Sequence, residues 1–269
     1  MTTAKPETEQ RAERNPDGAS VEAGPGALRG QVWLTVQTRQ AQRLIKGRNG
    51  NGDKPAIIGL VGFADRLRVI WQAARNDDPY ADWWLVKVHE SLEKACNRVN
   101  TEQAALDTQL EQLTALEVSL AESMKPYRIA LQFANPYAYR GARLIAEYDR
   151  LVRTLLTAHH VGILSNVATE GVLNTCARKI RSAFAIPQGY HFLSVDRAAM
   201  QQGTANASRA RQLMGEVPVD VLNGTHQATL TPRKVRCPDE AAKHMRLKPV
   251  ETTVTVAASV SLNDDVAGT

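Results

Sequence analysis

The chain has 269 residues, of which 43% are hydrophobic and 5% are aromatic, and it carries a net charge of +5. The hydrophobic fraction excludes general disorder, and the low aromatic content favours a mainly helical protein over a β-sandwich. The mild basic excess permits nucleic-acid binding without requiring it. No apolar run approaches the roughly 18 residues of a membrane span, so we predict a soluble cytoplasmic protein with no membrane partner.

One folded domain is expected between two tails. Residues 1–26 nearly lack large apolar side chains, which predicts a disordered N-terminal tail. Residues 232–269 show no stable helical or strand pattern, which predicts a flexible C-terminal tail. The folded domain then spans residues 27–231, and we expect it to be mainly α with a few short strands.

The first predicted strand spans residues 32–37, where Val32, Leu34 and Val36 alternate with other side chains. A short amphipathic turn through Leu44 and Ile45 follows. The segment from Arg29 to Lys54 has six basic residues and one acid, a local net charge of +5. Its glycine-rich loop lacks the Lys-Ser/Thr pair of a phosphate-binding loop, so no nucleotide site is expected there.

Two helices are predicted next. The first begins near Pro55. The second begins at Pro79, because Asp78 supplies an N-cap side chain and proline has a fixed φ at the first helical position. Its apolar residues recur in steps of four and three from Leu92 to Leu120, which predicts a long, coiled-coil-like helix of roughly forty residues. Such a helix needs a partner along its length, in this chain or in a second copy.

No pattern of catalytic or metal-binding residues stands out. The three cysteines lack CxxC spacing, the six histidines form no HExxH motif, and no serine lies in a GxSxG elbow. Capping accounts for Asp78 and Asp82 at the start of the long helix better than a metal site does. The sequence therefore predicts no enzyme, cofactor, metal ion or small-molecule substrate.

The segment 126–187 predicts one strand followed by two helices. Tyr127, Ile129, Leu131 and Phe133 share one face of a strand over residues 127–133. Asn135 and Pro136 then begin a helix that Gly162 ends, and a second helix begins near Ser165 or Thr169. A lone strand cannot satisfy its own backbone groups, so it needs a partner strand. Pairing with a second copy would form a ribbon-helix-helix unit and a homodimer.

The outer face of this strand carries the predicted DNA-reading side chains, Arg128, Ala130 and Gln132. Arginine donates two hydrogen bonds to a guanine edge, and glutamine pairs with adenine, so a ribbon in the major groove reads sequence. On the second helix, Arg178, Lys179 and Arg181 are predicted to neutralise phosphates. Two alternatives remain open: the strand at 32–37 forms the ribbon, or the two strands pair within one chain.

The remaining elements are short. Residues 190–195 predict a further strand. Asp196 begins a weak helix, which Gly203 destabilises and Gly215 ends.

Several sequence runs together resemble one known family. They are residues 62–68, residues 77–82, Phe133 to Tyr137, Glu147 to Asp149, and His160 to Gly162. The set, spread over residues 28–224, resembles proteins of integrating conjugative elements that are similar to the AcaB transcriptional regulators of conjugative plasmids.

The resemblance implies a ribbon-helix-helix-type protein that binds double-stranded DNA and activates conjugative transfer genes of a mobile genetic element. The alternative is a non-catalytic assembly protein of the conjugation machinery, which would use the long helix to dock a partner.

Overall fold

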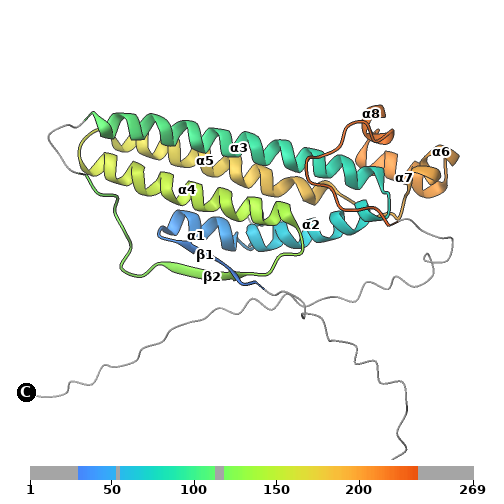
Figure 1. Ribbon diagram of the computed structural model, residues 1–269, viewed down its shortest axis with the longest axis horizontal. Coiled ribbons are helices and arrows are strands. Elements are labelled where there is room, and N and C mark those ends of the chain that lie inside the picture. The colour runs from blue at the N-terminus through green and yellow to red at the C-terminus, as the bar shows by residue number, and fades with distance from the viewer. Residues whose placement is uncertain (1–29, 53–54, 113–117, 236–269) are drawn as a thin grey trace, which may run out of the picture. The chain divides into compact units, whose positions relative to one another are not determined.

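The computed structural model describes residues 30–52, 55–112 and 118–235. The chain divides into an N-terminal unit, residues 1–31, and a second unit that begins at Val32 and holds every element named here. The elements, in chain order, are β1 (Val32–Val36), α1 (Arg39–Lys46), α2 (Leu60–Arg75), α3 (Pro79–Glu111), β2 (Tyr127–Leu131), α4 (Pro136–His160), α5 (Asn166–Ala185), the 3-10 helix η1 (Ile186–Gly189), α6 (Arg197–Gln202), α7 (Ala205–Met214) and α8 (Val219–Leu222) (Figure 1).

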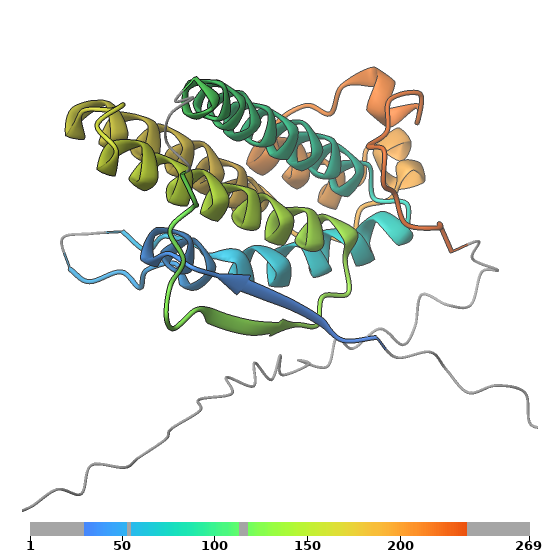
Figure 2. The same cartoon turned by 60° about the vertical axis from the view of Figure 1, so that its left-hand side comes forward.

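The mainly helical expectation is confirmed, and the helices pack in two layers. The three longest, α3, α4 and α5, pack against one another in one layer. The second layer consists of α1 and α2, which pack against α4, and the two strands lie outside it (Figure 2). The long helix α3 therefore finds partners along its length within this chain.

Large aromatic side chains fill the space between the layers. Phe63 of α2 stacks on Phe184 of α5 with ring centroids 4.6 Å apart, and both rings are fully buried. Gly141 of α4 faces this pair, and a Cβ atom there would lie 3.1 Å from the Phe63 ring and 3.2 Å from the Phe184 ring. A glycine at this position lets α4 approach both aromatic rings.

Three of the predicted helix starts are confirmed by side-chain caps. The Asp78 carboxylate accepts hydrogen bonds from the backbone N–H groups of Tyr80 and Ala81. Asn135 caps α4 in the same way, and Ser165 caps α5. These caps satisfy N–H groups that have no partner within the helix, so the sequence determines where each helix begins.

Two predicted helix boundaries were wrong. The helix expected from Pro55 begins at Leu60, because residues 55–59 return alongside the end of α1, with Arg48 and Ile57 exchanging two backbone hydrogen bonds. The long helix ends at Glu111 rather than near Leu120, and residues 113–117 lie outside the described part of the chain. Backbone groups of Ala121 instead bond to the side chains of Thr157 and Arg153 on α4.

The strand predicted at residues 190–195 was also wrong, because this segment has no strand structure. It is an extended connector held by other groups: the Tyr190 hydroxyl donates to Asp78, and the His191 N–H contacts the Met214 sulfur. Ser194 then takes a positive φ of 51°, which breaks the extended run. The weak helix that follows is two helices, because Gly203 adopts a left-handed conformation and ends α6.

Buried polar groups hold the C-terminal described segment to the start of α3. Asp82 is nearly inaccessible, and its carboxylate lies 2.7 Å from the Arg197 guanidinium and 3.3 Å from the Lys234 ammonium. The Val235 N–H donates to the Arg75 carbonyl. Lys234 and Val235 are thus in contact with the helices, and residues 236–269 of the predicted C-terminal tail lie outside the described residues. Among the described residues, no helix is long and apolar enough to cross a membrane.

Asp78 predicts a specific pH dependence of stability. Burial raises the pKa of its carboxyl from 3.8 to about 6, against the opposing effect of the hydrogen bond from Tyr190. The unfolded chain then loses this proton near pH 4 while the folded chain keeps it until about pH 6, so rising pH lowers the free energy of unfolding in that window. A shift of this size corresponds to about 3 kcal/mol between pH 4 and pH 7.

The Asp78→Asn variant removes this titration while keeping an oxygen acceptor for the cap. We expect its free energy of unfolding, relative to the unmodified chain, to rise by up to about 3 kcal/mol from pH 4 to pH 7 in urea titrations. Glu122→Gln, which replaces an exposed carboxylate instead of a buried one, serves as the control. A constant or falling difference for Asp78→Asn would contradict the prediction.

Candidate nucleic-acid interface

The two predicted strands pair with each other in one antiparallel ribbon. The register places Val32 opposite Leu131, Leu34 opposite Ile129, and Val36 opposite Tyr127. The strand that needed a partner therefore finds it in the same chain, which was one of the open alternatives. Pairing within the chain removes the argument that β2 requires a second copy.

One face of the ribbon packs on the protein and the other is open. Leu34, Val36, Ile129 and Leu131 are buried on the inner face. On the outer face, Trp33 lies opposite Ala130, and Thr35 lies opposite Arg128. Trp33, Thr35 and Arg128 are exposed, and Ala130 is half-buried. The outer face thus combines an aromatic ring, a hydroxyl and a guanidinium, groups that contact base edges in DNA grooves.

Arg128 lies against Trp33 on this outer face. The guanidinium carbon is 4.4 Å from the centroid of the Trp33 ring, a cation–π contact between diagonal neighbours on the two strands. The small side chain of Ala130, directly opposite Trp33, leaves room for this arrangement. Stacking restricts the guanidinium while its N–H donors remain exposed, which lowers the entropy cost of a bidentate contact.

Helix α4 anchors one end of the ribbon, where β1 ends and β2 begins. At the end of β1, the buried carboxylate of Asp149 accepts hydrogen bonds from the Gln37 N–H at 2.8 Å, the Thr38 N–H at 2.9 Å and the Thr38 hydroxyl at 2.7 Å. Before β2, Arg153 donates to the Ala121 carbonyl at 2.8 Å. The side-chain oxygen of Gln37 also accepts from the Ser123 N–H, so the residue that follows β1 is linked directly to the segment before β2.

Exposed basic side chains follow β1 directly in sequence. Arg39 and Arg43 of α1 are exposed, as is Lys46, whose ammonium lies 5.3 Å from the Tyr127 ring of β2. Within the described ranges none of these three cations forms an ion pair, and neither does Arg128. Unpaired surface cations next to a ribbon provide the positive charge that phosphate binding needs.

The other predicted site residues lie in two different parts of the chain. Gln132 is exposed but falls one residue beyond the end of β2. Arg178 and Lys179 are exposed on α5, and Arg181 is half-buried there. The main contacts of α5 are with α3 and α4, whereas β1 packs against α4. These α5 cations therefore occupy a different element from the ribbon's outer face.

Sequence reasoning left Trp33 and Thr35 out of the site. Treating the strands at 32–37 and 127–133 as competing ribbons hid the fact that their outer faces form one surface. The alternation of Trp33 and Thr35 with buried residues was the available signal. In the described part of the chain, no cluster of three or more His, Cys, Asp or Glu side chains is arranged to hold a metal ion.

The fold and the exposed ribbon define a helical protein with a basic strand face. A family model described as transcriptional regulator AcaB matches residues 24–234. The chain belongs to the AcaB family of transcriptional regulators.

Among solved structures, the crystal structure of selenomethionine-containing AcaB from uropathogenic E. coli is similar, with a TM-score of 0.50 and 14% sequence identity. The match covers 73% of this chain and 98% of that chain, and at this identity it shows a shared fold. No curated protein matches this chain.

Proposed function

We propose that this transcriptional regulator binds double-stranded DNA through the outer face of the β1–β2 ribbon. The observation that carries the proposal is the exposed Arg128 stacked on Trp33, next to the unpaired cations of α1. An antiparallel ribbon fits the major groove, where arginine recognises guanine. Membership in a family of transcriptional regulators supports the same conclusion.

The roles of the predicted residues follow from their positions. Arg128 reads a guanine, Gln132 an adenine, and Ala130 keeps the centre of the ribbon shallow. Arg39 and Arg43 neutralise phosphates beside the ribbon. The α5 cations, Arg178, Lys179 and Arg181, contact DNA phosphates farther along the same duplex or on a second duplex segment. We extend the proposal to activation of conjugative transfer genes of an integrating element, on the resemblance described above.

A homodimer belongs to the same proposal. Two copies related by a two-fold axis would place two ribbons on a palindromic operator, as is usual for dimeric regulators. This dimer would differ from the usual ribbon-helix-helix arrangement, because the two strands of each ribbon come from one chain instead of from two copies. Its free strand edges, one on each strand, leave a place for a second copy to add.

The test is a titration of the protein into labelled promoter DNA from the host element, with fluorescence anisotropy measured at several salt concentrations. Arg128→Ala should weaken operator binding by about 1–3 kcal/mol and leave most non-specific binding intact. Arg178→Ala should weaken binding to all sequences and reduce the salt slope by about one. The stoichiometry of the same titration reports whether two chains bind each operator.

Arg143→Ala is the matched control, because this arginine is exposed on α4 but pairs with Glu147 on the side that faces Cys96 of α3. It should bind operator like the unmodified protein. If Arg128→Ala also binds normally while Arg39→Ala or Arg43→Ala does not, α1 carries the contact and the ribbon does not. Absence of any binding at low salt would favour the assembly-protein alternative, in which the long helix docks a protein partner.

A further inference from the structure

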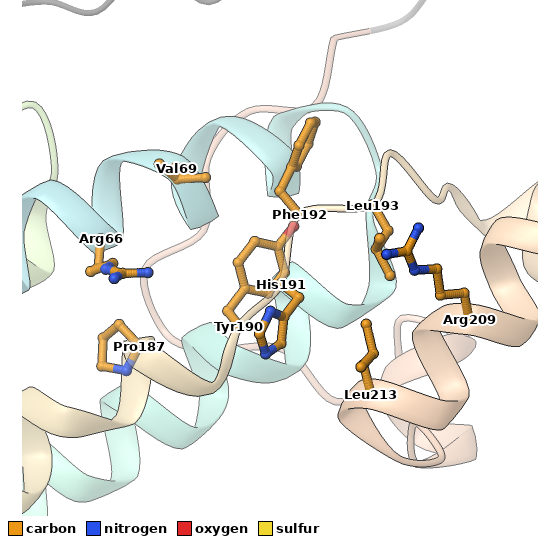
Figure 3. Close-up of a pocket in the computed structure, with 9 residues that line it drawn as sticks. All are labelled: Arg66, Val69, Pro187, Tyr190, His191, Phe192, Leu193, Arg209 and Leu213. Carbon is orange, nitrogen blue, oxygen red and sulfur yellow. The ribbon is translucent and has the colours of Figure 1, made fainter.

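A hollow of about 410 Å³ lies between α2, α7 and the connector that follows η1 (Figure 3). Its volume falls within the range of roughly 300–1,000 Å³ typical of ligand sites. The lining residues are Arg66, Val69, Pro187, Tyr190, His191, Phe192, Leu193, Arg209 and Leu213. Figure 1 shows α7 at the right-hand end of the helices, away from β1 and β2, so this hollow is separate from the proposed DNA surface.

Three large apolar side chains gather in the hollow and stay exposed. Val69 is 36% exposed, Phe192 47% and Leu213 51%, and each comes from a different element. Single exposed apolar residues are common on protein surfaces, but three that converge on one concave site indicate an interaction surface. Their exposure also shows that the hollow is open to solvent and would not enclose a small molecule.

The charge around the hollow is positive. Arg66 and Arg209 are both exposed, and among the described residues neither forms an ion pair. His191 also lines the site, and no acidic residue does. A ligand with carboxylates would therefore be complementary to the rim.

Hydrogen bonds hold the connector side of the hollow in place. Tyr190 is buried at the base, and its hydroxyl donates to Asp78 at 2.6 Å. The His191 N–H lies 3.3 Å from the sulfur of Met214, which joins the connector to the end of α7. The backbone turn at Ser194 follows immediately. A preformed surface reduces the ordering cost of binding.

We infer that this hollow binds an acidic peptide segment of another protein, with one apolar side chain of the peptide seated among Val69, Phe192 and Leu213. Carboxylates next to that side chain pair with Arg66 and Arg209. A peptide suits an open hollow because it covers the exposed apolar groups from above while its backbone stays in solvent. The regulator then holds DNA and a protein partner on separate surfaces.

The test uses a fluorescein-labelled peptide, Asp-Asp-Leu-Phe-Asp, and fluorescence anisotropy with the full chain. Arg209→Glu and Leu213→Asp should each weaken peptide binding roughly tenfold or more, because they reverse the rim charge and place a carboxylate in the apolar centre. Arg178→Glu and Leu156→Asp are matched controls on other exposed positions and should bind the peptide normally. A peptide with Asn for Asp and Ala for Leu and Phe should not bind.

DNA binding is measured on the same variants, which separates this inference from the proposed function. Arg209→Glu should leave DNA binding intact, whereas Arg178→Glu should weaken DNA binding and leave peptide binding intact. No peptide binding, or equal peptide binding by all variants, overturns the inference. So does a loss of self-association in Leu213→Asp without any effect on peptide binding, because a second copy would then cover the hollow.

Discussion

Replacing Gly59 with alanine is expected to destabilise the protein by about 3–5 kcal/mol, among the largest effects of a single methyl group. Gly59 lies where the start of α2 crosses the end of α1. A Cβ atom there would lie 2.4 Å from both the Gly47 nitrogen and the Ile45 carbonyl oxygen. Both are backbone atoms that cannot rotate away, so the two helix ends must separate.

Gly171→Ala is the matched control, because Gly171 is within α5 and nothing lies within 4 Å of its Cβ position. Alanine is favoured over glycine in a helix interior by about 0.5–1 kcal/mol, so this variant should be slightly more stable. Thermal unfolding followed by circular dichroism compares the two. Equal midpoints for both variants would show that the crossing tolerates a side chain.

Asp149→Ala is expected to have the second large effect, a loss of about 3 kcal/mol, because it leaves the half-buried backbone N–H groups of Gln37 and Thr38 and the Thr38 hydroxyl without their acceptor. The same change frees the junction between β1 and α1 from α4. We therefore expect faster hydrogen exchange at the amides of β1 and β2, together with weaker binding of operator DNA.

The control for Asp149→Ala is Glu122→Ala, which removes a surface ion pair to Arg153 at 3.0 Å. Exposed ion pairs contribute roughly 0–1 kcal/mol, so its stability should barely change. Unchanged exchange at the strand amides of Asp149→Ala would show that the ribbon is held by its apolar face alone.

Local signals in the sequence predicted the helix starts well. A capping side chain is combined with a proline at Asp78-Pro79 and again at Asn135-Pro136. The groups that start each helix therefore lie within four residues of each other in sequence. Helix ends were less predictable: the heptad spacing continues past Glu111, although α3 ends there and the backbone of Ala121 contacts α4. Periodicity reports which residues prefer one face and does not report where tertiary contacts interrupt a helix.

The candidate site was only partly predictable for a related reason. Arg128 and Ala130 were found from alternation along one strand, but the contribution of Trp33 depends on a partner strand far away in the sequence. Asp149 belongs to a run that carried the family resemblance, and its role as the anchor of Gln37 and Thr38 became visible only with α4 in place. Contacts of this kind leave no spacing signal in a single sequence.

The pairing of Val36 with Tyr127 also bears on when the ribbon can form during synthesis and folding. The two strands are separated by α1, α2 and α3, so closing this long loop comes at the cost of considerable chain entropy before any ladder hydrogen bond forms. During synthesis β1 has no partner strand until β2 has left the ribosome. We therefore expect the ribbon to form late in folding, and a truncated chain ending before residue 127 would carry the basic segment without the ribbon that we propose selects an operator.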